Sequence, residues 1–276
     1  MGEFKELINH LWNGHIPDWD IADRRSKNKA ISKYIQFTAD QTQFQSQGVT
    51  YIINPYDEFA IEEGLKTKEK LKEGTVTVVT VGPDRTVEAL RTAVAMGADN
   101  AVHVKADGML DTYLVSRALA EVCKKENGHI IFTGKQAIDD DQAATFSYVA
   151  ELLNYPSATV VVKCDISADK TKATLEQEGD GGAKNIIETA LPAVIGVNKG
   201  INTPRYASLP GIMKAKKKEI KTYTLNDLGL GSETNKTVEM DYQLPPERAA
   251  GKKLSGDIPA QVKELVRLLR EEAKVV

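Results

Sequence analysis

The sequence lacks the features that mark membrane-spanning, secreted or metal-binding proteins. Only two of its 276 residues are cysteine. Cys123 and Cys164 are far apart, which is not the spacing of a metal site and fits a reducing compartment. No apolar run approaches the roughly 20 residues that span a bilayer. Because the N-terminus has neither a secretory pattern nor an acid-poor transit sequence, we expect a cytoplasmic protein without membrane insertion.

An excess of positive charge is also missing. The chain carries 36 Lys and Arg against 39 Asp and Glu, and its formal net charge is −3. No general basic field is therefore available to attract nucleic acid, and we expect no nucleic-acid partner. The apolar fraction of 41% is ordinary for a globular protein, and the length suits one large α/β domain or two small ones.

The usual signatures of enzymes are missing as well. No GxGxxG follows a strand, no GxxxxGK[ST] occurs, and no Ser/His/Asp set stands out. The four histidines, His10, His15, His103 and His129, fall in the unclear N-terminal segment or in predicted strands, where structural roles are commoner than catalytic ones. The sequence predicts neither covalent catalysis nor a metal site.

What the sequence does contain is a regular alternation of strand-like and helix-like segments. β-branched runs predict strands at residues 49–53, 75–81, 100–104, 129–133, 159–164 and 193–197. Helical spacing predicts helices after Asn54-Pro55 and at residues 85–96, 114–125, 142–153 and 259–273. This order predicts a doubly wound, mostly parallel sheet. Residues 172–178 and 184–190, joined by a Gly-rich turn at residues 179–182, predict a β-hairpin.

A loop at residues 134–141 is the strongest candidate for ligand binding. It follows the strand at 129–133, and ligands bind beyond the carboxyl ends of strands in open parallel sheets. Residues 54–57 and 81–84 end on the same edge, so we expect three loops to meet where helix N-termini can receive a phosphate. The three aspartates at residues 139–141 would repel a phosphate, and they could instead cap the following helix, pair with Lys135 or hold a ribose hydroxyl.

A second candidate site lies between Pro204 and Lys218. Two prolines bracket a short segment that contains Leu209 and Met213 and ends in four lysines among five residues. An apolar tip beside dense positive charge suits docking of an acidic protein. A surface helix whose Leu and Met face the core explains the same composition equally well.

Five motifs in one order give a resemblance to a known family. Residues 54–58 (NPYDE), 91–99 (RTAVAMGAD), 134–141 (GKQAIDDD), 180–182 (DGG) and 204–218 resemble the β subunit of electron transfer flavoprotein. The resemblance extends from about Gly48 to the C-terminus.

The resemblance implies an electron carrier without covalent catalysis of its own. Such a β subunit is a Rossmann-like nucleotide-binding domain that packs on an α subunit, which carries the redox FAD. Most members hold a structural AMP in β, whereas the electron-bifurcating branch holds a second FAD there. Electrons arrive from acyl-CoA dehydrogenases of fatty acid oxidation, or from related flavoenzymes, and leave to a quinone oxidoreductase or another acceptor. The resemblance fits a bacterial cytoplasm or, alternatively, the mitochondrial matrix.

The resemblance also assigns residues to sites. The expected cofactor-binding residues are Asn54, Pro55, Tyr56, Asp57, Val81, Gly134, Lys135, Gln136, Ala137, Ile138, Asp139, Asp140, Asp141, Gln142, Ala143, Ala144 and Thr145. The expected partner-docking residues are Leu209, Pro210, Ile212, Met213, Lys214 and Lys217. Glu178 is expected near the flavin at the subunit interface. We expect an atypical segment at 1–30, an α/β domain at 31–224 that includes a recognition loop at 204–218, and a C-terminal arm and helix at 225–276 that pack on the α subunit.

Two departures from the family pattern leave alternatives open. Residues 1–30 show no convincing first strand, although Ile16-Pro17-Asp18 resembles the turn that follows one. Residues 142–146 (QAATF) lack the amides and the glycine usual at the phosphate, and Phe146 could narrow the approach to the helix terminus. We favour AMP over FAD or an empty site. A nucleotide-binding adaptor of the same fold without electron transfer is the second hypothesis.

Overall fold

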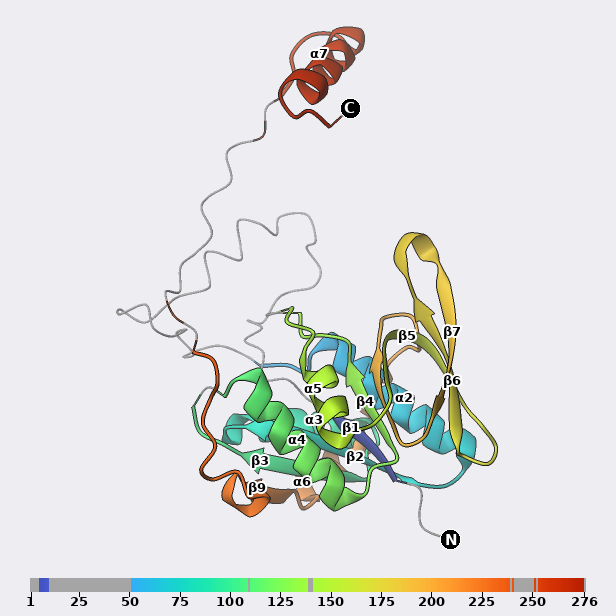
Figure 1. Ribbon diagram of the computed structural model, residues 1–276, viewed down its shortest axis with the longest axis vertical. Coiled ribbons are helices and arrows are strands. Elements are labelled where there is room, and N and C mark those ends of the chain that lie inside the picture. Colours follow the sequence, from blue (N-terminus) through green and yellow to red (C-terminus); the bar gives the residue numbers. More distant parts are fainter. Residues whose placement is uncertain are drawn as a thin grey trace.

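A single nine-stranded sheet organises the part of the chain described by the computed structural model (Figure 1), which comprises residues 5–9, 51–108, 110–138, 141–238, 240, 251 and 253–275. The strand order is β7-β6-β5-β8-β4-β1-β2-β3-β9. The strands are β1 (Lys5–Asn9), β2 (Thr75–Gly82), β3 (Asn100–Lys105), β4 (Ile130–Gly134), β5 (Ser157–Ile166), β6 (Lys172–Glu178), β7 (Lys184–Ala190), β8 (Ala193–Val197) and β9 (Lys221–Thr224). Along this order, every neighbouring pair from β5 through β8, β4, β1, β2 and β3 to β9 is parallel, whereas the pairs β5–β6 and β6–β7 are antiparallel.

Helices follow most of the parallel strands, as the alternating sequence predicts. The helices are α2 (Pro55–Leu71), α3 (Val87–Met96), α4 (Thr112–Glu126), α5 (Thr145–Leu153), α6 (Leu209–Lys217) and α7 (Ile258–Glu271). Short 3-10 turns occur at η1 (Asp84–Thr86), η2 (Asp180–Gly182) and η3 (Asn226–Leu228). The expected α/β class and the β6–β7 hairpin are confirmed.

The core lies on both faces of the sheet because the central strands are apolar throughout. In β2, Val76 and Val78 pack on the face covered by α2 and α3, whereas Val79 and Val81 pack on the face covered by α4 and α5. A strand buried on both faces needs a continuous apolar run, and the TVTVVTV segment supplies one. The sheet is thereby a fixed platform for the loops at its carboxyl edge.

The sequence of residues 1–30 shows no convincing first strand and leaves open whether the sheet has one; the structure contains one, β1. β1 lies in the middle of the sheet, hydrogen-bonded in parallel to β2 on one side and to β4 on the other. Its sequence, KELIN, has only two apolar residues, so a search for apolar runs misses it. The backbone groups of β2 and β4 leave a vacant strand position that a short polar segment can fill. Ile16-Pro17-Asp18 lies outside the described residues.

Two other boundaries differ from the predictions. Residues 51–54 are not in a strand; Ile53 is buried and the chain leads directly into α2, while residues 49 and 50 lie outside the described part. The helix predicted from residue 142 begins at Thr145, because Asp141 and Ala143 have left-handed φ values of 54° and 51°. A helix cannot pass through such residues, so the turn delays its start.

The hairpin and the last helix project from this arrangement. In Figure 1 the β6–β7 hairpin extends beyond the helices, and α7 stands apart from the sheet. No residue of α7 is buried. None of the helices in the described ranges is both long and apolar enough to cross a bilayer.

Candidate functional site

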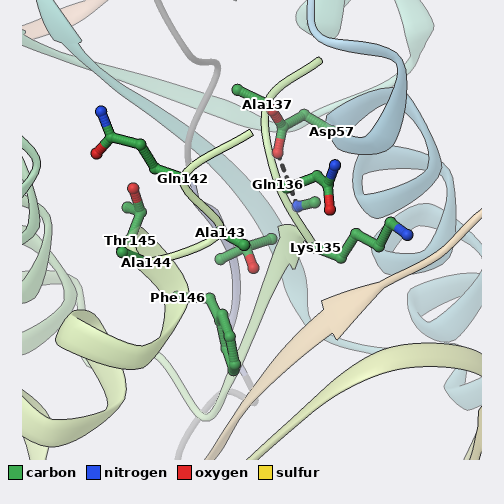
Figure 2. Close-up of a pocket in the computed structure, with 11 residues that line it drawn as sticks. Asp57, Lys135, Gln136, Ala137, Gln142, Ala143, Ala144, Thr145 and Phe146 are labelled. Carbon is green, nitrogen blue, oxygen red and sulfur yellow. Dashed lines mark hydrogen bonds between the residues drawn. The ribbon is translucent and has the colours of Figure 1, made fainter. Parts of the chain in front are cut away.

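A small pocket opens at the carboxyl end of β4, where the sequence predicts a ligand site. Figure 2 shows that residues from the N-terminal end of α2, the loop after β4 and the start of α5 surround this pocket. Its enclosed volume is only about 30 Å³. The lining residues are Asp57, Thr133, Gly134, Lys135, Gln136, Ala137, Gln142, Ala143, Ala144, Thr145 and Phe146. Most of the predicted cofactor-binding residues therefore come together.

The first turn of α2 holds the loop after β4 in place. The Asp57 Oδ1 accepts a hydrogen bond from the Gly134 backbone N–H at 2.7 Å. Asn54 donates to the Gln136 carbonyl at 3.0 Å and accepts from the Ile138 N–H at 3.3 Å. Asn54 also donates to Asp57 at 2.9 Å, so the two side chains form one buried network. Asn54 and Asp57 thus shape the pocket and have most of their hydrogen-bonding capacity in use.

Gly134 is required by this close approach of α2 to the sheet. A Cβ atom added there would lie 2.7 Å from the Tyr56 Cβ and 2.9 Å from the Asp57 Oδ1. Both distances are shorter than the van der Waals contact distance of the atoms, so a side chain at this position would clash with α2. Across the loop, the Lys135 Nζ lies 5.1 Å from the centroid of the Tyr56 ring, a cation–π contact.

The opposite wall of the pocket is formed by the start of α5. The first residues of α5 follow Ala144, whose side chain cannot cap the helix. A helix N-terminus carries unpaired N–H groups and a partial positive charge, both of which favour an anion. Thr133, a buried residue that lines the pocket, has a hydroxyl Oγ1 with no hydrogen-bond partner among the described residues. A polar ligand would satisfy that hydroxyl.

The remaining predicted residues fall into three groups. Asn54, Tyr56 and Ile138 contact or stabilise the loop without lining the pocket, Pro55 is the first residue of α2, and Asp141 accepts a 2.6 Å hydrogen bond from the Gln136 side chain. Val81 is buried in β2, which β1 separates from β4. Asp139 and Asp140 lie outside the described residues.

The expected meeting of three loops is only partly correct. Residues 54–57 and the loop after β4 meet, whereas residues 81–84 do not line the pocket. Instead, Asp84 pairs with Lys105 at 2.7 Å on the next strand. The interposed β1, which the sequence pattern does not reveal, accounts for the gap.

Sequence reasoning missed two lining residues. Thr133 is the last residue of the predicted strand, and its place at the strand's carboxyl end is the signal that could have found it. Phe146 was expected to narrow the helix terminus. Its ring is half-buried against the core cluster that contains Val149 and Ala150, and it points away from the other labelled side chains in Figure 2.

A wider hollow adjoins the pocket. It has a volume of about 300 Å³ and shares Gln142 and Ala144 with the first pocket. Tyr113 and Tyr148 line it with their rings edge to face, 5.9 Å between centroids. A ligand larger than the enclosed volume could therefore continue across residues 142–144.

The predicted docking segment forms a short helix on the other side of the molecule from α4. Ser208 caps α6 by accepting a hydrogen bond from the Gly211 N–H at 3.1 Å. Within the helix only Ala215 is buried. The expected docking residues Leu209, Pro210, Ile212, Met213, Lys214 and Lys217 are all exposed. Leu209 is 78% exposed and Met213 57%, so the reading in which they face the core is wrong.

Glu178 lies at the end of β6, where the hairpin meets the sheet. Its Oε2 accepts a hydrogen bond from the Asn198 side chain at 2.8 Å. Asn198, which directly follows β8, is buried and fixes one oxygen of the exposed Glu178.

Comparison with known proteins identifies the family. A family model described as "Electron transfer flavoprotein domain" matches residues 41–228. A protein of Bacillus subtilis (strain 168) named electron transfer flavoprotein subunit beta is 43% identical over 237 residues, covering 84% of this chain and 91% of that protein. The chain belongs to the electron transfer flavoprotein β-subunit family.

Other members of the electron transfer flavoprotein β family match along nearly their whole length. The mitochondrial β subunit of Arabidopsis thaliana is 40% identical over 256 residues, covering 93% of this chain and 98% of that protein. The Homo sapiens β subunit is 38% identical over 254 residues, covering 90% and 97%. The family inferred from the ordered motifs is thus confirmed, and its name describes a flavoprotein that transfers electrons.

Proposed function

We propose that this chain is the β subunit of a heterodimeric electron transfer flavoprotein that binds AMP in the pocket at the end of β4. The proposal rests on one pocket that combines the N-terminus of α5, which Ala144 cannot cap, with the Thr133 hydroxyl, which has no hydrogen-bond partner among the described residues. Together they supply donors for an anionic, polar ligand. Membership of this family supports a nucleotide as that ligand. In this proposal the α subunit carries FAD, which supplies the redox chemistry.

The residues present fit an AMP molecule better than the altered loop sequence suggests. Ala143 and Ala144 have no side-chain amides, but the backbone N–H groups at the start of α5 do not depend on side-chain identity. Phe146 packs against the core, so it does not close the helix terminus. Asp57 is engaged by the Gly134 N–H, which limits its repulsion of a phosphate. The chain's part is to bind and orient the nucleotide at this edge.

Counting cofactors in the purified heterodimer tests the proposal. We expect acid release and chromatography to give one AMP and one FAD for each pair of subunits, and the isolated chain to be nearly colourless. Two FAD would assign the chain to the electron-bifurcating branch, with the adjoining hollow as room for the larger ligand. Failure to form a stable complex with any α subunit would favour the non-redox adaptor.

A single hydroxyl provides a sharper test of the pocket. Thr133→Val keeps the shape of the side chain and removes the Oγ1, so we expect AMP affinity to fall about tenfold for a lost buried hydrogen bond. Thr86→Val is the matched control, because the Thr86 hydroxyl is also buried without a partner among the described residues but lies outside the pocket. Equal AMP affinity in both variants would contradict the assignment of Thr133.

We further propose that α6 docks the electron donor, an acyl-CoA dehydrogenase or a related flavoenzyme, and that electrons leave to a quinone oxidoreductase. The support is the exposed apolar side chain of Leu209 beside the exposed Lys214 and Lys217. Leu209→Ala should slow reduction of the flavin by the donor about tenfold, with flavin content unchanged, because an interface anchor is lost. Leu209→Met, which keeps an apolar side chain, should remain close to normal. Normal reduction of Leu209→Ala would exclude Leu209 as the anchor.

The C-terminal arm and α7 belong to the same proposal. Val262, Leu265 and Val266 form an apolar stripe at helical spacing and are all exposed. We propose that this stripe packs on the α subunit, and that Glu178 faces the subunit interface near the flavin.

A further inference from the structure

One arginine connects the docking segment to the body of the domain. Arg205 directly precedes Tyr206, and its guanidinium reaches back to two carboxylates of α2. It donates to Glu62 at 2.8 and 3.0 Å and to Glu69 at 2.7 and 3.1 Å, while its backbone N–H donates to Glu62 at 3.1 Å. Each carboxylate is thus held by two side-chain hydrogen bonds, the geometry in which arginine is most specific.

The Glu62 half of this network is protected from water. The Glu62 side chain is 6% exposed, against 58% for Glu69 and 35% for Arg205. Solvent screening therefore weakens the Glu69 contact and leaves the Glu62 contact strong. The hydrogen bonds to Glu69 and Glu62 raise the pKa of Arg205 above its ordinary value, and the hydrogen bond from Arg205 lowers the pKa of Glu69. Arg205 and Glu69 therefore keep their charges across the physiological pH range.

The helix that receives Arg205 is itself fixed. Its first turn is hydrogen-bonded to the loop after β4 through Asp57, as described above. Three residues before Arg205, the Asn202 side chain donates to the Phe59 carbonyl and to Glu63, both at 2.9 Å. Residues 202–205 are therefore clamped on α2 at two successive points.

The other end of the docking segment is held by α3. Arg91 Nη1 donates to the carbonyls of Ala215, Lys216 and Lys218 at 2.5, 3.3 and 3.4 Å, which caps the C-terminus of α6. Between the two clamps, Tyr206 is 97% exposed and Leu209 is 78% exposed. Two arginines thus span the part of the segment whose apolar side chains face solvent.

We propose that Arg205 is a positioning residue for electron-donor docking: by fixing residues 204–208 on α2, it presents Tyr206 and Leu209 in one arrangement before the donor arrives. This inference rests on the proposed docking function of α6. A binding surface that is already ordered loses less conformational entropy when it associates. Loss of Arg205 should therefore weaken donor binding and leave the subsequent electron transfer unchanged.

The experiment uses the heterodimer and separates binding from turnover. Steady-state reduction by the purified donor gives KM for the donor and kcat for Arg205→Ala, Arg205→Lys and Leu209→Ala. We expect KM to rise about tenfold in Arg205→Ala. In Arg205→Lys, which keeps the charge but loses the paired hydrogen bonds of the guanidinium, KM should rise about threefold. In both variants kcat should stay within about twofold of the normal value. Lys70→Ala is the control, because it removes an exposed ion pair of α2 with Asp165 that does not touch the docking segment.

A double-mutant cycle excludes a purely structural role. If Arg205 acts by placing Leu209, the two alanine substitutions together should raise KM by clearly less than the product of their separate effects. General loosening of the fold would instead lower AMP content and Tm in parallel with kcat. If Arg205→Ala does not fold, Arg205→Lys takes its place in the cycle.

The outcomes distinguish this inference from the docking proposal. An unchanged KM in both Arg205 variants, with a raised KM in Leu209→Ala, overturns the positioning role and leaves docking by α6 intact. A fall in kcat at normal KM also overturns it. A normal KM in Leu209→Ala contradicts the docking proposal itself.

Discussion

Helices α6 and α7 both expose apolar side chains, yet they are held in opposite ways. α6 is fixed from outside itself, by Arg91 at its C-terminus and by Arg205 just before its start. α7 relies on contacts within its own length, such as the hydrogen bonds of Arg267 to Glu264 and Glu271. One helix has a buried residue, Ala215, and the other has none.

The difference indicates two kinds of interaction. A helix fixed on the domain can recognise a transient partner at little entropic cost, which suits docking of an electron donor. An isolated amphipathic helix of the length of α7, 14 residues, is marginal in water, and most helical stability in proteins comes from packing an apolar face on another element. For α7 a permanent subunit is the more suitable partner.

The largest effect we expect comes from the apolar face of α7. Val262→Asp combined with Leu265→Asp places two carboxylates in the proposed subunit interface, so affinity for the α subunit should fall at least about 100-fold. Titration of one subunit with the other measures it. Lys263→Asp, a charge change on the same helix outside the stripe, should bind nearly normally. Normal heterodimer formation by the double variant would contradict the role of α7.

A next, smaller effect should follow from separating α6 from α3. Gly211→Ala puts a Cβ 2.3 Å from the Ala95 carbonyl oxygen, so the helix must shift. We expect a loss of about 1–3 kcal/mol in the free energy of unfolding and slower reduction by the donor. Denaturant unfolding measures the first effect. Gly179→Ala is the control, because its added Cβ would find its nearest neighbour at an ordinary 3.6 Å. Equal stability of the two variants would show that α6 is not tightly seated.

The lysines of α6 should contribute a few-fold effect that depends on salt. Lys214→Gln with Lys217→Gln should lower the rate of reduction by the donor a few-fold at low ionic strength, because exposed charges steer association. The difference should disappear above roughly 0.5 M salt, where the Debye length is only a few ångströms. Stopped-flow reduction at several salt concentrations provides the test. A deficit independent of salt would assign the lysines a contact role instead.

The smallest effect concerns the base on which the docking segment rests. Burial raises the pKa of Glu63, although the hydrogen bond from Asn202 opposes this. The folded state therefore binds this proton more tightly than the unfolded state does, and the contribution is lost as pH rises through the folded pKa. Glu63→Gln should be more stable than the parent at pH 7, by about 1 kcal/mol or less, and the difference should shrink toward pH 4. Unfolding curves at both pH values check the sign.

The elements that the sequence predicts well are those with a local physical signal. The β-branched run of β2 and the Gly-rich turn between β6 and β7 each carry their pattern within a few residues. The loop after β4 could be predicted as a candidate ligand site because a strand and a helix flank it. β1 could not be recognised in this way, because its place in the sheet depends on vacant hydrogen-bonding positions of β2 and β4, far away in sequence.

The site shows the same division. Residues 134–137 and 142–145 line the pocket as the sequence predicts. The Thr133 hydroxyl, which has no hydrogen-bond partner among the described residues, and the separation of residues 81–84 from the pocket depend instead on how the strands are ordered. The composition of residues 204–218 left a surface helix and a docking tip equally possible. The structure shows a helix whose apolar side chains face outward, so the core-facing alternative is wrong and docking stays a prediction.

The sequence by itself determined the family, the α/β class and the two segments proposed to carry function, because periodicity and short motifs are local properties of a chain. Only the tertiary structure decided which side chains are free to act. In the sequence, Arg205 is one of many charged residues. In the structure, Glu62 and Glu69 of α2, which lie at least 136 residues away in sequence, are within 3.1 Å of its guanidinium. Such a contact depends on how helices are stacked on the sheet, and no local pattern encodes it.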